Sequence, residues 1–342
     1  MIKRILGVTF VFVLFMLGLS PMSAAQAPIV CFRFTSWWPM PDGGYPPGWF
    51  YYSPYPGTFV VEIAAHTASC PPAAAHKETC PTCPSAGSPI SVATGNTFIK
   101  QTDVSLSGLG GGLTLARTWN SAWPITQAIS SVGLFGPNWR STYEERIFMS
   151  GDNYLKYARS DGSFWSFGLT ANGGMGQFIV AAPANVSATL TPGASYWILT
   201  FQNGEQRRFS LTTGLLTAIV DRNGNTTQLT YDGSNRLTTV TDPASRHLYF
   251  NYANGSSLLV TSLTSDFGIT VSYSYDAQGR LSLVTRPGQT TVSFTYNTQS
   301  QITQVTDSGE KVLESHTYDS SGRGLTSSQA NGVNSLTITY PQ

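Results

Sequence analysis

Charged residues are scarce in this sequence. Only 11% of the 342 residues are Asp, Glu, Lys or Arg, and 19 basic residues nearly balance 18 acidic ones, whereas soluble domains usually carry about 25% charge. The net charge of +1 gives no reason to expect nucleic acid as a partner, because nucleic-acid binders carry a basic patch or stripe. Ser, Thr, Gly and Asn are abundant in place of charged residues, and they favour strands and tight turns over charged helices.

Long apolar runs are also absent, with one exception at the N-terminus. The run from Ile5 to Leu19 follows Lys3 and Arg4 and precedes a stretch of small residues. This order is typical of a secretory signal peptide, with cleavage expected after Ala25. The alternative is an uncleaved anchor, but the run is short for a membrane span. We therefore expect residues 1–25 to be removed. The remaining chain is expected to be secreted or held at the cell surface, with the periplasm as another destination and no membrane span.

Cysteine is absent after residue 83. The four cysteines are Cys31, Cys70, Cys80 and Cys83. An even number in an exported chain favours disulfides, although the sequence does not give their pairing. The spacing of Cys80 and Cys83, with His66 and His76 nearby, also fits a redox or zinc half-site. A redox motif of this kind needs a βαβ setting, which the surrounding prolines do not favour. Disulfides are therefore the prediction, and metal or free thiols are the alternatives.

Residues 26–87 form a distinct segment rich in proline and aromatic residues. Twelve of the 20 prolines fall between residues 28 and 89. Proline removes a backbone donor and fixes φ, so the segment is expected to be mostly irregular. Its aromatic side chains are interpreted in two ways. They pack on the β domain that follows, which is the preferred interpretation, or Trp37, Trp38 and Trp49 form a binding surface for a polysaccharide or a partner chain.

No part of the chain beyond the signal peptide has a sustained helical period. From residue 88 onward the pattern is that of β-strands. Leu113, Leu115, Arg117 and Trp119 occupy alternate positions, the period of a half-buried strand. Two pairs of apolar runs flank Asp161-Gly162 and Asn203-Gly204, and Asp-Gly and Asn-Gly between such runs predict β-hairpins.

A repeat occupies the last third of the chain. Six tyrosines recur at intervals of 21, 23, 21, 22 and 22 residues: Tyr231, Tyr252, Tyr275, Tyr296, Tyr318 and Tyr340. Alternating apolar residues precede most of them, and a turn and a second short run follow, so each unit of about 22 residues is predicted to be a hairpin. In the second run the apolar residues are three apart, as in Leu237 and Val240. Either both faces of that strand are covered or a bulge redirects one side chain.

These residues carry a family resemblance. The pattern Tyr-Asp-x-x-Gly/Asn-Arg-Leu-x-x-Val, found at 231–240 and 275–284, resembles the YD repeat of RHS proteins. A third copy departs from it, because Gly324 separates Arg323 from Leu325. Segments 88–98, 113–121 and 136–140 look like the domain that opens the RHS core. The resemblance covers about residues 88–342. It implies a β-sheet that spirals into a hollow shell, which in many members encloses a C-terminal toxin cargo and in others is displayed at the cell surface.

No catalytic constellation stands out in the sequence. The histidines are scattered, and His247 and His316 are expected to have surface or hairpin roles. Asp and Arg recur with the repeat, whereas a catalytic site needs each residue once. Asp is expected to bind turn amides and Arg to bridge neighbouring hairpins. The repeat-defining residues besides the six tyrosines are Asp232, Arg236, Asp276, Arg280, Asp319 and Arg323. No enzyme, cofactor or metal site is predicted.

The sequence therefore predicts an all-β protein with four parts. These are a signal peptide (1–25), an irregular Pro/Cys-rich segment (26–87), an RHS-type β domain (88–195) and a curved antiparallel sheet of hairpin repeats (196–342). The expected function is that of a non-enzymatic, exported segment of a toxin shell, with a toxin cargo or a further repeat-containing chain as partner. The alternative is a cell-surface adhesin that binds glycans.

Overall fold

The computed structural model describes residues 29–30, 32–35, 49–51, 60–63, 84–123, 130, 132–150, 154–170 and 177–340. The predicted signal peptide and all four cysteines lie outside these residues, as do Trp37, Trp38 and most of segment 26–87. Four short strands of that segment are described: β1 (Ile29–Val30), β2 (Phe32–Thr35), β3 (Trp49–Tyr51) and β4 (Val60–Ile63).

The prediction of an all-β fold is confirmed, since strands and three 3₁₀ turns are the regular elements of the described residues. The strands of the first half are β5 (Ser85–Ala86), β6 (Ile90–Ser91), β7 (Phe98–Leu106), β8 (Leu113–Asn120), β9 (Val132–Gly133), β10 (Gly136–Pro137), β11 (Trp139–Ser141), β12 (Arg146–Met149), β13 (Leu155–Ala158), β14 (Phe164–Thr170) and β15 (Phe178–Ala182). Those of the second half are β16 (Ala188–Pro192), β17 (Tyr196–Phe201), β18 (Gln206–Ser210), β19 (Leu216–Val220), β20 (Thr226–Tyr231), β21 (Leu237–Thr241), β22 (His247–Tyr252), β23 (Val260–Ser265), β24 (Thr270–Tyr275), β25 (Leu281–Arg286), β26 (Thr290–Tyr296), β27 (Ile302–Asp307), β28 (Val312–Tyr318), β29 (Gly324–Gln329) and β30 (Val333–Thr337). The 3₁₀ turns are η1 (Leu109–Gly111), η2 (Pro287–Gln289) and η3 (Ala330–Gly332).

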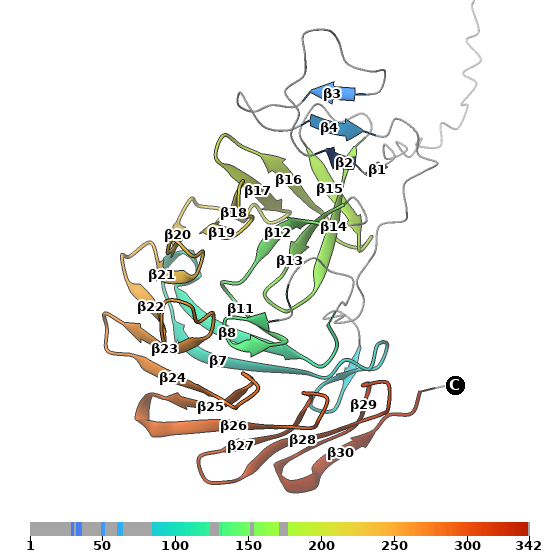
Figure 1. The fold of residues 1–342 in the computed structure, drawn as a ribbon, viewed down its shortest axis with the longest axis vertical. Helices are drawn as coiled ribbons and strands as arrows, with labels where there is room; N and C mark the ends of the chain where they lie inside the picture. The colour runs from blue at the N-terminus through green and yellow to red at the C-terminus, as the bar shows by residue number, and fades with distance from the viewer. Residues whose placement is uncertain are drawn as a thin grey trace, which may run out of the picture.

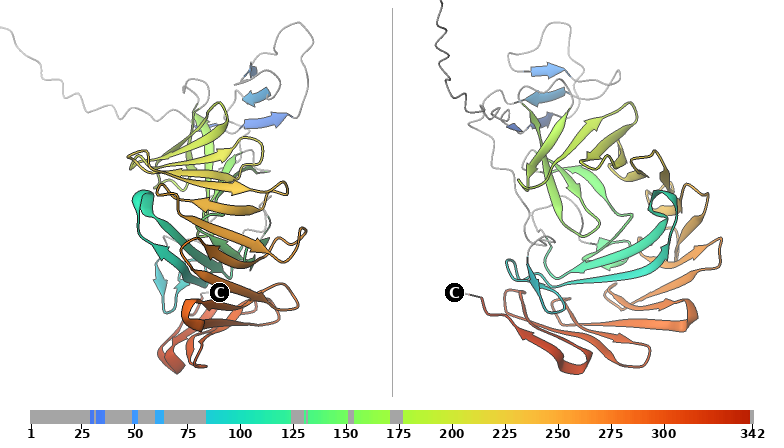
Figure 2. Two further views of the ribbon diagram at one scale, coloured as in Figure 1. Left: turned by 90° about the vertical axis from the view of Figure 1, so that its left-hand side faces the viewer. Right: turned by 180° about the vertical axis from the view of Figure 1, so that it is seen from behind.

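One sheet of 20 strands dominates the molecule. Strands β12 to β30 follow one another in it in chain order, each antiparallel to the next, and β1 lies against β14. The hairpins predicted around Asp161-Gly162 and Asn203-Gly204 are confirmed as β13–β14 and β17–β18. Figure 1 shows that this sheet curves strongly from β12 round to β30, and we call it the wall. Seen from behind and from the side, its strands run across the curve (Figure 2).

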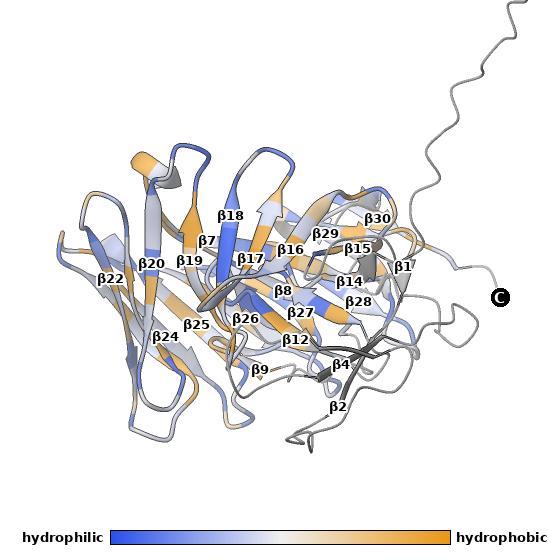
Figure 3. Cartoon of the chain, turned by 90° about the horizontal axis from the view of Figure 1, so that it is seen from above, coloured by the Kyte–Doolittle hydropathy of each residue, from blue (hydrophilic) through white to orange (hydrophobic). Residues whose placement is uncertain are grey.

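Alternation of apolar and polar residues gives the wall two different faces. In β24, Val271 and Tyr273 are buried whereas Thr270, Ser272 and Ser274 are exposed, and hydropathy alternates in the same way along other strands of the wall (Figure 3). A single hairpin is marginally stable in water, whereas neighbouring hairpins bury their apolar faces together.

A bulge in each repeat explains the apolar residues that stand three apart. Tyr231 pairs with Leu237 and Thr230 with Thr239, so Thr238 is the extra residue between them. Leu237 and Val240 consequently point to the same face, and both are buried. The extra residue also has a polar role. The Thr238 hydroxyl donates to the Thr230 carbonyl at 3.0 Å, and three further repeats have the same bond: Thr261 to Asn251, Ser282 to Ser274 and Thr303 to Thr295.

A second, smaller sheet fills the inside of the curve. It has the order β11–β8–β7, we call it the inner sheet, and it lies within the arc of the wall in Figure 1. Its residues and those of the adjoining loops pack directly on the buried face of the repeats. Phe135 contacts Tyr273 with ring centroids 4.8 Å apart, and Trp139 contacts Phe294 at 5.3 Å. The hydrophobic core therefore lies between the inner sheet and the wall.

Candidate functional site

The recurrent tyrosines mark the joints between repeats. The hydroxyl of Tyr252, at the end of β22, donates to the carbonyl of Leu237, the first residue of β21, at 2.8 Å. All six repeat tyrosines make this bond to a residue 15 or 16 positions earlier, and each acceptor begins a strand. The pairs are Tyr231–Leu216, Tyr252–Leu237, Tyr275–Val260, Tyr296–Leu281, Tyr318–Ile302 and Tyr340–Gly324, at 2.6–2.8 Å.

Burial keeps these hydroxyls protonated. Removal from water disfavours the phenolate, and it raises the pKa of Tyr231, Tyr252, Tyr275, Tyr296 and Tyr318 above the usual value. A carbonyl oxygen only accepts hydrogen bonds, so the tyrosine hydroxyl must be protonated to donate one. The joint is therefore a stable neutral hydrogen bond at physiological pH.

The Asp of each full repeat closes the turn next to the joint. One carboxylate oxygen of Asp232 accepts the backbone amides of Ser234 (2.9 Å) and Arg236 (3.0 Å), and the other accepts Nε of Arg236 at 2.7 Å. The backbone amide and the side chain of Arg236 lower the pKa of Asp232. Asn235 in this turn has φ of 61°, a conformation that Asn and Gly adopt most readily. Asp276 and Asp319 make the same set of bonds.

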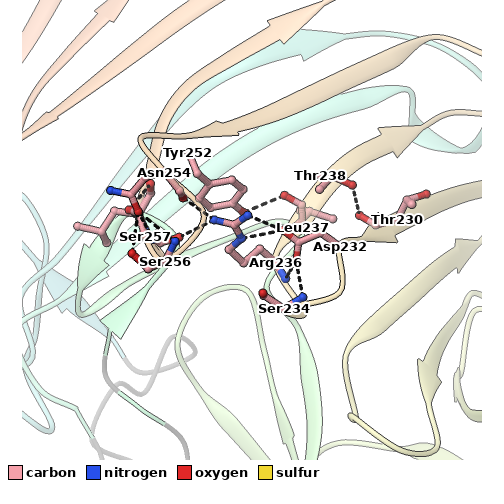
Figure 4. Close-up of polar contacts among 11 residues, drawn as sticks. Thr230, Asp232, Ser234, Arg236, Leu237, Thr238, Tyr252, Asn254, Ser256 and Ser257 are labelled. Carbon is pink, nitrogen blue, oxygen red and sulfur yellow. Dashed lines mark hydrogen bonds and ion pairs between the residues drawn. The ribbon is translucent and has the colours of Figure 1, made fainter.

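The Arg of the repeat connects one turn to the next. The guanidinium of Arg236 lies 4.6 Å from the ring centroid of Tyr252, and its Nη1 donates to the carbonyls of Asn254 and Ser257 (Figure 4). Arginine combines planar stacking with several donors, which lysine does not. Arg280 lies over Tyr296 at 4.7 Å and Arg323 over Tyr340 at 4.2 Å. The turns 232–236, 254–257, 276–280, 297–301 and 319–323 all lie along one rim of the wall, which we call the YD rim.

A degenerate repeat keeps the connection with neutral residues. Asn297 and Gln301 stand where a full repeat has Asp and Arg. The Asn297 side chain accepts the amides of Gln299 and Gln301, and Nε2 of Gln301 donates to the carbonyl of Gly322 at 2.8 Å. The link from one turn to the next therefore does not depend on charge.

An Asp–Arg turn of the same kind lies on the opposite rim, and sequence reasoning missed the role of its arginine. Asp242 binds the amides of Ala244 and Arg246 and the Nε of Arg246, and Nη2 of Arg246 donates to the carbonyl of Ser107 at the end of β7. The signal was present in the sequence, since Asp242 and Arg246 have the same spacing as Asp232 and Arg236. Thr241 precedes Asp242, where the full repeats have a tyrosine.

A buried ion cluster holds the inner sheet to the wall, and sequence reasoning missed it too. Arg117 of β8 and Asp103 of β7 form a bidentate pair with fully buried side chains. Tyr273 of β24 donates to Asp103 at 2.9 Å, and Arg286 of β25 donates to it at 3.1 Å. The Arg117 guanidinium also lies 4.7 Å from the ring of Trp139. Burial alone would raise the pKa of Asp103, but the two arginines and Tyr273 outweigh it and lower this pKa. We call these residues the hub.

The remaining candidates for chemistry are not brought together. His247 is partly exposed and pairs with Asp266 at 2.8 Å, whereas His316 is fully buried in β28, contrary to a surface role, and faces Glu314 at 3.4 Å. His66, His76 and the four cysteines lie outside the described residues. Within the described residues, no group of three His, Cys, Asp or Glu side chains is placed to hold a metal ion. In the same part of the chain, no helix has the length and apolar character needed to cross a bilayer.

Comparison with known families agrees with this geometry. Residues 212–247 and 256–291 match the family described as RHS Repeat, and they span the joints of Tyr231 and Tyr275. The chain contains RHS/YD repeats. Residues 87–167, which include the inner sheet, match a domain of unknown function, DUF6531. The DUF6531 match therefore covers the inner sheet and the first strands of the wall, and the RHS matches lie farther along the wall, from β19 to the start of β26.

Similar proteins of known name are much longer. The chain is 33% identical over 146 residues to the tRNA nuclease WapA of Bacillus subtilis, and this match covers 43% of the chain and 6% of the relative. It is 32% identical over the same length to the tRNA3(Ser)-specific nuclease WapA of Bacillus spizizenii, again 6% of the relative. Among solved structures, TcdB2-TccC3 without its hypervariable C-terminal region has a TM-score of 0.28 and 12% identity, over 68% of this chain and 14% of that one.

Proposed function

We propose that this chain is a non-enzymatic, exported structural segment that forms one end of a toxin-associated shell. Its partner is a toxin cargo or a further repeat-containing chain, which the shell encloses or presents. Export rests on the signal peptide expected at residues 1–25. Residues 88–195 form the end domain in this proposal and include the inner sheet and the first strands of the wall, and residues 196–342 continue the wall with the hairpin repeats.

The observation that carries the proposal is the set of hydrogen bonds that the repeat-defining residues make. Six tyrosine hydroxyls bind backbone carbonyls of a neighbouring strand, and the Asp and Arg residues close turns and join them. Side chains that recur for such bonds serve the continuity of a sheet, because each repeat cannot bury its apolar face alone. Repeat-defining chemistry of this kind supports a structural role and leaves no recurring side chain to act on a substrate.

The filled interior supports the assignment as a shell end. The inner sheet occupies the space within the curve, and the hub and the Phe135–Tyr273 and Trp139–Phe294 contacts attach it to the wall. A shell that holds cargo needs a closed end, through which neither water nor cargo can pass. A close-packed interior provides such a closed end. In this proposal the cargo lies beyond the segment and not within it.

The named relatives are consistent with a toxin association. They are called tRNA nucleases, and the matched residues make up only 6% of their length. We propose that the shared part is structural in those proteins and that cleavage of RNA belongs to the remainder. The aromatic glycan-binding alternative has no observation in its favour, because Trp37 and Trp38 lie outside the described residues.

Two assays test the proposal. The purified chain, incubated with total tRNA, is expected to leave it intact, and specific cleavage that co-purifies with the chain would overturn the non-enzymatic assignment. Co-expression with the polypeptide encoded next to it is expected to give one stable complex in which that polypeptide resists protease. A neighbour that is as sensitive to protease in the complex as alone would rule out the shell role.

A further inference from the structure

A hollow of about 230 Å³ lies where the loop before β12 meets the first two joints of the YD rim. The wall contributes Leu215, Tyr231, Leu237 and Leu258 to its lining, and the loop side contributes Leu134, Tyr143, Glu144 and Arg146. The hollow has no part in the bonds of the joints or of the hub, and ligand binding in it does not depend on the shell role.

Arg146 brings an unpaired positive charge to the hollow, whereas other charged groups of the lining have partners: Glu145 pairs with Arg207 and Arg236 with Asp232. The guanidinium of Arg146 has no ion pair or side-chain hydrogen bond among the described residues, and its Nε is buried without a partner. The joint arginines differ in this respect, since Arg236 and Arg280 each pair with an Asp in their own turn. Burial lowers the pKa of Arg146. A half-buried cation of this kind is stabilised by an anion that binds beside it.

Glu144 lines the same hollow, and its carboxyl is buried near Arg140. Its Oε1 accepts the amide of Leu134, and its Oε2 is buried without a hydrogen-bond partner. Burial raises the pKa of Glu144. The negatively charged form of this carboxyl, which would repel an anion in the hollow, is therefore disfavoured by burial.

Leucines form the apolar part of the lining, which also includes Ser130, Arg140, Glu145, Asn235 and Arg236. Leu134, Leu215 and Leu237 lie along the hollow, and Leu258 stands at its opening with 60% of its surface exposed. Covering an apolar side chain that is this exposed is favourable, because it removes apolar surface from water. The volume is below the roughly 300–1,000 Å³ of pockets for drug-sized ligands, so the hollow suits a short chain.

We propose that this hollow binds a carboxylate carried on a short apolar chain, with the carboxylate on Arg146 and the chain against the leucines. Such a group is found in a free short-chain carboxylic acid and at the C-terminus of a peptide that ends in an apolar residue. The chemistry recognised is the same in both cases.

Isothermal titration of the full chain tests the proposal with four probes. Hexanoate and a tripeptide ending in leucine carry the carboxylate, and hexanamide and the C-terminally amidated tripeptide are their neutral counterparts. At least one carboxylate is expected to bind saturably, and its amide is expected to bind about tenfold more weakly or worse, because a charge-assisted hydrogen bond is lost. Binding of hexanoate alone identifies a free acid as the ligand, and binding of the tripeptide alone identifies a peptide terminus. Absence of binding by both, or equal binding of acid and amide, would overturn the proposal.

Variants locate the site. Arg146→Gln is expected to weaken carboxylate binding about tenfold or more, whereas Arg222→Gln, at an exposed position outside the hollow, is expected to leave it unchanged. Leu258→Glu alters only the exposed opening, so the fold is retained and the added negative charge is expected to abolish binding. Carboxylate binding that survives both Arg146→Gln and Leu258→Glu would show that the ligand binds elsewhere.

Discussion

The ring of Tyr252 takes part in two contacts with consecutive residues of the chain. Its hydroxyl lies 2.8 Å from the carbonyl oxygen of Leu237, and the guanidinium of Arg236 lies 4.6 Å from its centroid. One side chain therefore fixes both the start of β21 and the turn before it. The same relationship links Tyr296 to Leu281 and Arg280, and Tyr340 to Gly324 and Arg323.

Removal of one joint hydroxyl is expected to weaken the fold by a small, measurable amount. Tyr252→Phe keeps the ring under Arg236 and deletes the bond to Leu237, so the free energy of unfolding should fall by about 1 kcal/mol. Urea denaturation measures the change. Tyr249→Phe is the matched control, because that hydroxyl is exposed and makes no hydrogen bond within the described residues. An equal effect of the two substitutions would contradict the role assigned to the joint.

The connection that Arg236 makes is expected to depend on the shape of its guanidinium and not only on its charge. Arg236→Lys keeps the charge but loses the planar stack on Tyr252 and the forked bonds to residues 254 and 257. Amide hydrogen exchange is expected to become faster in the turn at residues 254–257 and to stay unchanged near residues 297–301. Arg222→Lys, at an exposed position, serves as the control. Unchanged exchange at 254–257 in Arg236→Lys would show that the contact does not order the turn.

The hub is expected to be the most sensitive polar site of the fold. Asp103→Leu leaves Arg117 buried without its partner, and breaking a buried ion pair in this way costs about 3–5 kcal/mol. The midpoint of chemical denaturation reports the loss. Asp266→Asn, which breaks the exposed pair with His247, is expected to have a much smaller effect. A loss in Asp103→Leu as small as that of Asp266→Asn would mean that the inner sheet is not held by the hub.

Alkaline pH is expected to unfold the repeats cooperatively. Burial raises the folded-state pKa of Tyr231, Tyr252, Tyr275, Tyr296 and Tyr318 above the unfolded value of about 10. The unfolded state then binds fewer protons above that pH, so the stability from these groups is complete below about pH 10 and is lost as the pH rises toward the folded pKa. Tyrosinate absorbance should therefore rise in a step that coincides with loss of the β-sheet circular dichroism signal. Gradual ionisation of all tyrosines without unfolding would contradict the buried joints.

The repeat architecture was predictable because its signals are local. Tyrosine spacing and period-2 alternation indicate hairpins, and Asp161-Gly162 and Asn203-Gly204 mark two turns correctly, since a turn is decided by a few adjacent residues. The bulge was one of two open alternatives, and the register of Tyr231 with Leu237 decides between them.

The hub and the packing of the inner sheet were not predictable in this way. Asp103 meets Tyr273 170 residues later and Arg286 183 residues later, and no short-range pattern encodes such a contact. Arg117 was read as one member of an alternating strand, but a buried arginine is identified only by the aromatic rings and the carboxylate around it. His316 lies in the β28–β29 hairpin opposite Ser327, as a hairpin role requires, but its side chain is buried and not at the surface.

Cross-linking of Ser88 and Ser327 tests the central claim most directly. The wall is proposed to curve until β29 meets the start of the β domain, where the Ser88 amide donates to the Ser327 hydroxyl at 2.7 Å across 239 residues of sequence. In the chain with Ser88→Cys and Ser327→Cys, mild oxidation should join the two positions, as identified by mass spectrometry of proteolytic fragments. The pair Ser88→Cys and Ser282→Cys should not join. Absence of the first cross-link in the folded protein, or equal formation of both, would contradict a wall that curves around the inner sheet.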